Sequence, residues 1–428
     1  MRCCLRVRVS DMERYEAYKD SGIEWIGEIP QHWLISKGVR ALSVRYGYPF
    51  ESNRFSNTKG WPLIRIRDVG SKTTESLYDG EFVESARIEN GDILVGMDGE
   101  YKVARWEGHT ALLNQRVCAL ENSAVLLKDY LLYLMPEALR LINELTYGTT
   151  VKHLGAKDLN AMSLICPPID EQRAIADYLD AKTAEVDALV ADCEREVGLL
   201  REYRKAAISE AVTKGLDPDA PMKDSGVEWI GEIPASWDIV RFKAIGTVVA
   251  NLQHPTDYPD LPQVSPDRIE KDSGRLLPCI SVAEVGVESD NHLFHIGDIL
   301  YSKVRPALNK VTIAPFDGMC SADMYPIESS QNRRWLVFYM LSNAFMEQVV
   351  VSTDRVKMPK VNKEELGAFK VVLPSLDAQS EIVAYLDAKT AEIDSLIEEK
   401  QEMADKLREY RKSLISEAVT GKFKVPGA

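Results

Sequence analysis

Residues 19–33 read KDSGIEWIGEIPQHW, and residues 223–237 read KDSGVEWIGEIPASW, with 12 of 15 positions identical at an offset of 204 residues. A second repeat pairs residues 178–213 with residues 385–420 at an offset of 207, with 22 identities in 36 positions. Two copies are too few for a solenoid, so these repeats indicate a molecule with pseudo-twofold symmetry.

The segments between the repeats resemble each other only faintly, although the sequence GDIL at residues 91–94 recurs at residues 297–300. We therefore expect repeated segments to alternate with two variable domains. The expected boundaries are an N-terminal segment with the first junction (1–33), a first variable domain (34–166), a central helical segment (167–222), a second junction (223–237), a second variable domain (238–373) and a C-terminal helix with its tail (374–428).

The second repeat predicts two long helices that begin after proline-containing loops. Asp170 and Asp377 are placed to cap the helix starts, and Gly215 and Gly421 mark the ends. Each helix would run for roughly 43 residues, or about 65 Å at 1.5 Å per residue.

Apolar residues recur on both helices at alternating steps of three and four, which predicts a coiled-coil seam. The expected seam positions are Val186, Leu189, Cys193, Glu196, Leu200, Tyr203 and Ala207 in the first copy, and Ile393, Leu396, Lys400, Met403, Leu407, Tyr410 and Leu414 in the second. Neither helix could stand alone in water with such a seam, and equivalent domains precede both, so we expect them to pair antiparallel. This register predicts an ion pair between Glu196 and Lys400.

The variable domains have the pattern of mixed α/β structure. Strand-like segments occur at residues 62–69, 92–97, 116–120 and 298–304, and helical periodicity occurs at residues 124–147 and 333–351. The predicted fold is therefore mixed α/β, with two α/β domains separated by two long antiparallel helices that form a coiled-coil spacer. Trp25, Trp33, Trp229 and Trp237 lie in the repeated junctions, and we expect them to be core anchors.

Composition and motifs exclude several classes of protein. No apolar run is long enough to span a membrane, and the first eleven residues lack the apolar core of a signal peptide. The seven cysteines are scattered without a C-x-x-C spacing, which favours a reducing, cytoplasmic location. We expect those eleven residues to be disordered and Met12 to be a plausible start.

The motifs of several enzyme classes are absent from the sequence. It lacks a phosphate-binding loop, the adenine-methyltransferase tetrapeptide, a glycine-rich S-adenosylmethionine loop and an H-E-x-x-H metal motif. His292 and His295 form a lone pair without further ligands nearby, so a structural or surface role is favoured over a metal site. The sequence combines a duplicated scaffold, two divergent domains and no recognisable reactive site. This combination favours a recognition protein over an enzyme.

The repeated junction, the PPIDEQR segment at residues 167–173 and the YLDAKTAE…ISEAVT helix resemble the specificity subunit of type I restriction-modification systems. The resemblance covers nearly everything from Met12 to Lys422, but the second helix starts with DAQSE at residues 377–381 instead of DEQR. It implies a non-catalytic DNA-binding subunit that holds two modification methyltransferase subunits and, in the full complex, ATP-dependent restriction subunits. It further implies that each variable domain reads one half of a bipartite double-stranded DNA target and that the helices set the gap. S-adenosylmethionine, ATP and magnesium would then bind only to partner subunits.

Within the variable domains, cations and hydroxyl groups in turns or beside strands suit phosphate and base-edge contacts. We expect Arg65 and Arg67 to alternate along one strand and share a face, and Lys303 and Arg305 to do the same. The candidate DNA-binding residues are Arg65, Arg67, Lys72, Thr149, Thr150, Lys152, His153, Lys303, Arg305, Thr353, Arg355 and Lys357.

Many identities between the helix copies lie off the apolar seam, where a coiled coil does not need them. Two copies of one partner docking on both helices would need them, whereas a recent duplication with solvated faces is the alternative. The candidate partner-binding residues are Asp180, Lys182, Glu185, Arg201, Glu202, Arg204 and Lys205, with Asp387, Lys389, Glu392, Arg408, Glu409, Arg411 and Lys412 in the second copy.

The net charge of −14, from 66 acidic and 52 basic residues, argues against a protein that coats DNA non-specifically. The first variable domain has 16 basic and 16 acidic residues and the second has 15 and 17, so most of the acid lies on the repeated scaffold. We therefore expect the isolated chain to bind DNA weakly and to need its partners' basic surface. Two other classes stay open: a coiled-coil tether with two protein-binding domains, and a self-sufficient nuclease or methyltransferase with a cryptic site.

Overall fold

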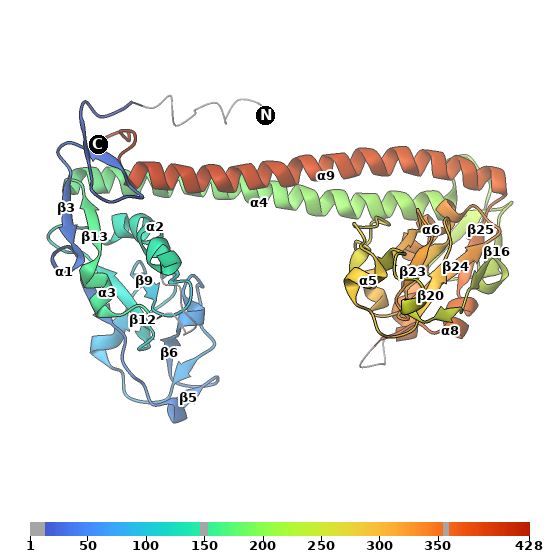
Figure 1. Ribbon diagram of the computed structural model, residues 1–428, viewed down its shortest axis with the longest axis horizontal. Coiled ribbons are helices and arrows are strands. Elements are labelled where there is room, and N and C mark those ends of the chain that lie inside the picture. The colour runs from blue at the N-terminus through green and yellow to red at the C-terminus, as the bar shows by residue number, and fades with distance from the viewer. Residues whose placement is uncertain (1–12, 146–152, 354–358) are drawn as a thin grey trace. The chain divides into compact units, whose positions relative to one another are not determined.

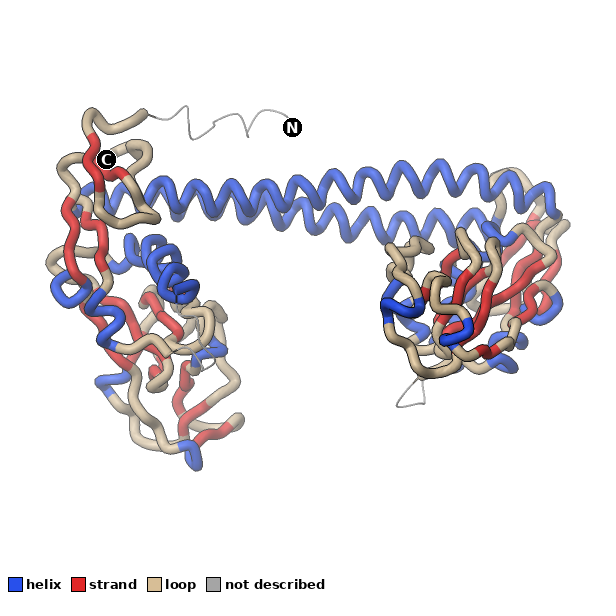
Figure 2. Tube along the Cα trace, viewed as in Figure 1, coloured by secondary structure: helices blue, strands red, loops and turns tan. Residues whose placement is uncertain are grey.

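The computed structural model describes residues 13–145, 153–353 and 359–428, and these form two compact units. Unit 1 combines the chain up to Asp192 with Met403–Ala428, and unit 2 is Cys193–Glu402. The segment expected to be disordered, residues 1–11, lies outside the described residues. Both units mix strands and helices, and each includes part of both long helices, as Figures 1 and 2 show. The mixed α/β prediction is confirmed.

Unit 1 contains a β-hairpin, a strand pair and two sheets. The four-stranded sheet has the antiparallel order β10-β9-β12-β4, and the five-stranded sheet has the order β5-β7-β6-β11-β8 with β6 and β11 parallel. The strands are β1 (Tyr18–Asp20), β2 (Glu28–Pro30), β3 (Leu34–Lys37), β4 (Ser43–Tyr46), β5 (Phe55–Ser56), β6 (Trp61–Ile64), β7 (Leu77–Tyr78), β8 (Arg87–Ile88), β9 (Ile93–Gly96), β10 (Val103–Arg105), β11 (Ala111–Leu113), β12 (Val117–Glu121) and β13 (Ser163–Cys166). The short and medium helices are α1 (Gly38–Ala41), α2 (Lys128–Leu145) and α3 (Ala156–Ala161), with the 3₁₀ turn η3 (Ile66–Asp68) after β6.

Unit 2 repeats this plan, and its antiparallel sheet has the equivalent order β22-β21-β24-β17. Its second sheet, β18-β20-β23-β19, again contains one parallel pair, β19 with β23. The strands are β14 (Met222–Asp224), β15 (Glu232–Pro234), β16 (Asp238–Arg241), β17 (Gly246–Val248), β18 (Leu252–Gln253), β19 (Gln263–Val264), β20 (Asn291–Phe294), β21 (Ile299–Ser302), β22 (Val311–Ile313), β23 (Gly318–Cys320), β24 (Met324–Ser329) and β25 (Lys370–Leu373). The helices are α5 (Val282–Val285), α6 (Arg333–Leu341), α7 (Asn343–Thr353) and α8 (Lys363–Ala368).

One helix predicted over residues 333–351 is in fact two, because the chain breaks between α6 and α7 at Ser342. The Ser342 hydroxyl donates to the carbonyl of Tyr339 at 2.6 Å and accepts from the backbone N–H of Phe345 at 3.4 Å. A serine that bonds to the backbone in this way competes with the helical hydrogen bonds.

The cores of both units lie between a sheet and the long helices α4 (Ile169–Lys214) and α9 (Leu376–Val419). In unit 1, Tyr130 and Leu134 of α2 pack in one apolar cluster with strand residues of β9 and β12 and with Leu179 of α4. In unit 2, α6 occupies the equivalent place, and Trp335 packs with strand residues of β21 and with Ile208 of α4. Each domain is therefore built onto the helices through an apolar core.

A buried glutamine at the start of each long helix fixes that helix to its domain. Gln172 is fully buried, accepts from the N–H of Leu127 at 2.8 Å, and donates to the carbonyls of Val125 and Pro167 at 2.7 and 2.8 Å. Gln379, its counterpart at the offset of 207, is also fully buried. It accepts from the N–H of Asn332 at 3.0 Å and donates to the carbonyl of Pro374 at 3.0 Å and to the side-chain oxygen of Gln331 at 2.9 Å. The glutamine is therefore kept in both copies although the residues around it differ.

The expected capping aspartates lie inside the helices. The helices begin at Ile169 and Leu376, so Asp170 and Asp377 occupy the first turn. There their charge favours the helix dipole without capping it.

The helix ends follow the prediction. Gly215 and Gly421 adopt φ of 80° and 69°, and a Cβ at Gly421 would lie 2.5 Å from Pro30 and 2.8 Å from Trp33. Glycine is thus required at Gly421 both by conformation and by the close approach of the junction.

Three of the four junction tryptophans contribute to cores. Trp33 is fully buried, Trp237 is 7% exposed and Trp25 packs half-buried against the core of unit 1. The prediction for Trp229 is wrong, since its side chain is 42% exposed. No helix in the described ranges is long and apolar enough to cross a membrane.

The long helices pair antiparallel within each unit, as predicted. In unit 2, Glu196 pairs with Lys400 and Arg204 pairs with Asp394. Residues later in α4 thus pair with residues earlier in α9, as in an antiparallel arrangement. The predicted ion pair of Glu196 with Lys400 is confirmed, and it raises the pKa of the lysine.

Four of the fourteen predicted seam positions are displaced by one residue. The buried or partly buried stripe includes Val186, Val190, Cys193, Val197, Leu200 and Arg204 in α4, and Ile393, Ile397, Lys400, Ala404, Leu407, Arg411 and Leu414 in α9. The predicted seam residues Glu196, Ala207 and Tyr410 are also partly buried. Leu189, Tyr203, Leu396 and Met403, which the apolar pattern favoured, are instead exposed. At Tyr203 the seam position belongs to Arg204, which a search for apolar residues passes over. Leu189 and Leu396 are each followed by a second apolar residue, Val190 and Ile397, that lies in the seam instead.

Candidate nucleic-acid interface

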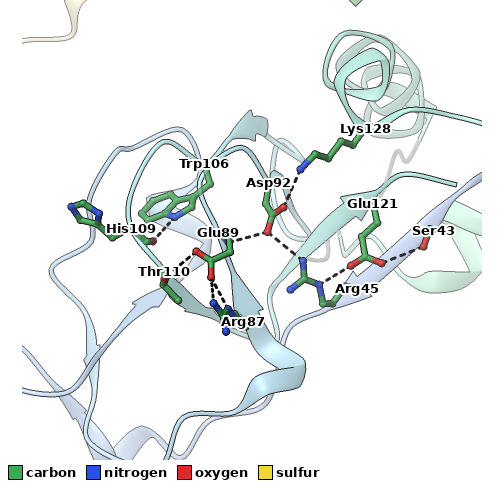
Figure 3. A network of polar contacts seen from close by, with 10 residues as sticks. All are labelled: Ser43, Arg45, Arg87, Glu89, Asp92, Trp106, His109, Thr110, Glu121 and Lys128. Carbon is green, nitrogen blue, oxygen red and sulfur yellow. Dashed lines mark hydrogen bonds and ion pairs between the residues drawn. The ribbon is translucent and has the colours of Figure 1, made fainter. Parts of the chain in front are cut away.

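The aspartate of the repeated GDIL motif holds the central strand of each domain to the preceding turn and to the helix that follows the sheet. In unit 1, Asp92 accepts from the backbone N–H of Glu89 at 3.0 Å and pairs with Lys128, the first residue of α2, at 3.2 Å. Arg45 joins Asp92 at 3.3 Å and Glu121 at 2.9 Å, which extends the network across β4 and β12 (Figure 3). These contacts fix β9 against the helix that follows the sheet.

The second copy of the motif repeats the arrangement. Asp298 accepts from the backbone N–H of His295 at 2.8 Å and pairs with Arg333, the first residue of α6, at 3.3 Å. Gly91 and Gly297 both have φ of 87°, which glycine adopts without strain. Both central strands, β9 and β21, are therefore anchored in the same way and end at equivalent places.

Arg65 and Arg67 do not lie on a strand, so the prediction that they share a strand face is wrong. Strand β6 ends before Arg65, and the turn η3 follows because Asp68 accepts from the backbone N–H of Arg65 at 2.9 Å. The Arg65 guanidinium lies over the ring of Phe55, 5.5 Å from its centroid, and Arg67 donates to the Ser76 hydroxyl at 3.0 Å. Both cations therefore sit on a structured turn after β6.

Lys72 follows these arginines on the same surface segment. Its ammonium group pairs with Glu107 at 2.6 Å, and both side chains are at least half exposed. Such an exposed pair contributes little to stability, so the lysine can exchange its carboxylate for a phosphate.

His153 lies at the end of β9, where the chain returns from α2. Its Nδ1 lies 2.7 Å from the Asp98 carboxylate and 3.3 Å from Arg116, and Leu154 donates its N–H to the carbonyl of Met97 at 2.7 Å. Arg116 was not among the predicted DNA-binding residues. It opens a predicted strand, and its position beside His153 follows only from the pairing of β9 with β12.

Lys303 and Arg305 lie at the equivalent end of β21. The prediction that they share a strand face is wrong, because β21 ends at Ser302 and Arg305 has φ of 45°. Lys303 lies over the ring of Tyr325 at 5.0 Å, and the backbone N–H of Arg305 donates to the carbonyl of Pro359 at 3.2 Å.

The returning chain therefore meets the end of the central strand in both units. In unit 2, Val304 forms a bridge with Lys360, just as Asp98 does with His153 in unit 1. The structure brings Lys303 and Arg305 next to Pro359 and Lys360, the segment before α8. In the sequence, the cations at the end of β21 and those before α8 form two separate groups. Thr149, Thr150, Lys152, Arg355 and Lys357 lie outside the described residues, and so does the side chain of Thr353 at the end of α7.

Among the candidate partner-binding residues, Asp180 and Asp387 make intramolecular contacts. Asp180 pairs with Arg105 at 3.1 Å and accepts from the Tyr133 hydroxyl, while burial and this bond raise the Tyr133 pKa to about 12. Asp387, its counterpart, pairs with Arg334 at 2.9 Å. Both aspartates thus join a domain to its helix.

Arg204 and Arg411 are seam residues. Arg204 pairs with Asp394 at 2.8 Å, and Arg411 pairs with Asp187, the residue equivalent to Asp394, at 2.8 Å. Lys182 and Lys389 pair along their own helices with Glu185 and Glu392 at 2.7 and 3.0 Å. The six remaining candidates, Arg201, Glu202, Lys205, Arg408, Glu409 and Lys412, have exposed or half-exposed side chains.

Comparisons with known proteins agree in one family. A family model described as the type I restriction modification DNA specificity domain matches residues 42–192 and 237–405. The EcoDI specificity subunit of a type I restriction enzyme from Escherichia coli is 28% identical over 413 residues, covering 93% of this chain and 90% of the relative. The EcoBI specificity subunit from the same species is 29% identical over 429 residues, covering 94% and 89%. A chain from a solved structure, described as the structural basis underlying complex assembly and conformational transition of the type I R-M system, has a TM-score of 0.69 at 16% identity, covering 91% of this chain and 98% of that one.

Proposed function

The chain belongs to the family of type I restriction-modification specificity subunits, and on this premise we propose that each of its two domains reads one half of a bipartite DNA target. The family assignment gives it DNA sequence specificity within a type I system. The internal duplication supports the finer proposal, because two divergent domains on one repeated scaffold can recognise two different half-sites.

The end of the central strand is the proposed base-reading edge of each domain. Arg116 beside His153 in unit 1, and Lys303 with Arg305 in unit 2, place cations where the chain that follows α2 or α7 meets the end of β9 or β21. The arginines and lysines suit phosphate and guanine contacts, and neighbouring hydroxyl groups suit either. In unit 1, Arg65, Arg67 and Lys72 add a second group of cations for the DNA backbone.

The long helices set the gap between half-sites in this proposal, and they carry two modification methyltransferase subunits. The chain itself performs no catalysis, and S-adenosylmethionine, ATP and magnesium belong to the modification and restriction subunits. Because each domain is near neutral, the affinity for DNA depends on the basic surface of the partners.

An exchange of one domain tests the proposal. Residues 34–166 are replaced by the corresponding domain of a relative, the chain is expressed with its modification subunits, and the methylated motif is read by methylome sequencing. One half-site should change while the other half and the gap remain, and exchange of residues 238–373 should change the other half. A change in both halves after either exchange would refute the assignment of one half-site to each domain.

A further inference from the structure

The two junction hairpins are the most closely preserved part of the repeat. Residues 19–30 and 223–234 differ only by isoleucine at position 23 and valine at position 227. They form the hairpins β1–β2 and β14–β15 with the same register. The connecting turns also match, since Gly27 and Gly231 donate their N–H groups to the carbonyls of Ile23 and Val227 at 3.0 Å.

Folding explains most of the shared residues. Asp20 and Asp224 accept from the N–H groups of Gly22 and Gly226 at 2.9 Å. The glycines of each turn have φ between 64° and 70°, and each copy places two isoleucines in a core. Each of these residues would be retained if the hairpins had no role beyond structure.

Folding does not explain the glutamate of either turn, and it explains the tryptophan of the first turn only in part and that of the second not at all. Glu24 and Glu228 are exposed, and no hydrogen bond or ion pair joins their side chains to another described residue. Trp25 packs partly on the core of unit 1, but Trp229 is 42% exposed and has no ring contact among the described residues. The second copy keeps the tryptophan although its side chain is exposed, so packing alone does not account for it there.

The hairpin surface is acidic, which excludes DNA as its partner. Each copy carries an aspartate and two glutamates against one lysine, so phosphate groups would be repelled. A carboxylate next to an indole suits an arginine or lysine, which can pair with the acid and stack on the ring. Tryptophan is also among the residues that contribute most at protein interfaces.

Some of the residues that are identical in the two helix copies, and that the sequence suggested for partner binding, make contacts within the chain instead. Asp180, Asp387, Arg204 and Arg411 are used inside the chain. Within the described part of the chain, the exposed glutamates of the hairpin turns therefore remain as repeated residues without an intramolecular role, beside exposed helix residues such as Glu202 and Glu409.

We propose that the two hairpins are twin docking sites for one type of partner protein, one copy on each, held by Glu24 with Trp25 and by Glu228 with Trp229. The partner is the modification subunit, which would present a basic side chain to each indole. This inference rests on the proposed function, which requires two identical partners on the repeated scaffold, and it adds to the helices one further contact point for each partner.

The test uses the full chain and purified modification subunits without DNA. Light scattering coupled to size exclusion counts the subunits bound, and titration calorimetry gives the affinity of each site. The variant Glu228→Lys with Trp229→Ala removes both docking groups of unit 2. The matched control, Glu81→Lys with Trp61→Ala, removes an exposed acid and a 46% exposed tryptophan outside the repeats.

The wild type and the control should bind two modification subunits, and the Glu228 and Trp229 variant should bind one. Affinity at the altered site should fall about 30-fold, which corresponds to about 2 kcal/mol at 1.4 kcal/mol per tenfold change. The single variant Glu24→Lys should weaken the other site. Binding of two subunits by the double variant, with both affinities within about threefold of wild type, would overturn the inference while leaving the proposed function intact. A wild type that binds no modification subunit would overturn both.

Discussion

Replacing Asp394 by alanine removes the carboxylate that neutralises a buried arginine in the helix seam. The Arg204 side chain is 9% exposed, and it donates to Asp394 at 2.8 and 3.3 Å. It also donates to the carbonyls of Asp272 and Ser273 at 3.2 and 3.0 Å. After the substitution the guanidinium keeps the two carbonyls but loses its counter-charge.

The expected cost is about 2 kcal/mol. Breaking a fully buried ion pair by removing one partner costs about 3–5 kcal/mol. The Asp394 carboxylate is 46% exposed, however, so water screens part of the interaction. The equivalent pair in unit 1, Arg411 with Asp187, is 37% and 55% exposed, and its loss should cost about 1 kcal/mol or less.

Hydrogen exchange measured by mass spectrometry resolves the two sites within one chain. For Asp394→Ala, amides of α4 around Arg204 should exchange about 30-fold faster, because 1.4 kcal/mol corresponds to a factor of ten. For the control Asp187→Ala, amides around Arg411 should exchange no more than about fivefold faster. Unit 1 should be unaffected by the change at Asp394.

A second variant separates loss of charge from loss of packing. Arg204→Leu combined with Asp394→Ala should restore protection of the seam, since an apolar pair can replace a buried ion pair. The loop at Asp272 and Ser273 should then exchange faster, because it loses its donor. Equal, small effects of Asp394→Ala and Asp187→Ala would refute the argument from burial.

Three further outcomes follow from the structure. Gln172→Ala should lower the free energy of unfolding of unit 1 by about 2–4 kcal/mol because three buried hydrogen bonds are lost; thermal unfolding should show no comparable loss for the exposed Gln401→Ala, and equal shifts would contradict this. Insertion of one heptad after Gly198 and another after Glu399 keeps the seam in phase and adds about 10 Å, so the methylated gap should grow by about three base pairs at 3.4 Å each; an unchanged gap would contradict the spacer role. The isolated chain should bind duplex DNA with a dissociation constant of about 10⁻⁴ to 10⁻⁶ M, the non-specific range, as measured by fluorescence anisotropy. Tight, sequence-specific binding without partners would contradict the dependence on the partners' basic surface.

The repeats predicted the architecture because a duplication is directly visible when the sequence is aligned with itself. The antiparallel pairing, the helix ends at Gly215 and Gly421 and the contact of Glu196 with Lys400 all follow from aligning the two copies. The seam positions were harder to predict, because two of them are held by charged residues, the buried Arg204 and the partly buried Arg411, which pair with aspartates. Both arginines and both aspartates are identical in the repeats, so pairing them across the two copies could have revealed the seam.

The candidate DNA-binding residues were less accessible to sequence reasoning. Alternation of Arg65 with Arg67 suggested a strand, but one side-chain bond from Asp68 turns the chain instead. The approach of His153 to Arg116 depends on strand register and on the return of the chain, which no local pattern records.

Methylome sequencing of cells that express this chain with its modification subunits tests the central claim most directly. The account predicts one bipartite motif with two fixed half-sites, a constant gap between them and one methylated adenine on each strand. A continuous motif, or methylation without a fixed gap, would contradict the reading of two half-sites by two domains.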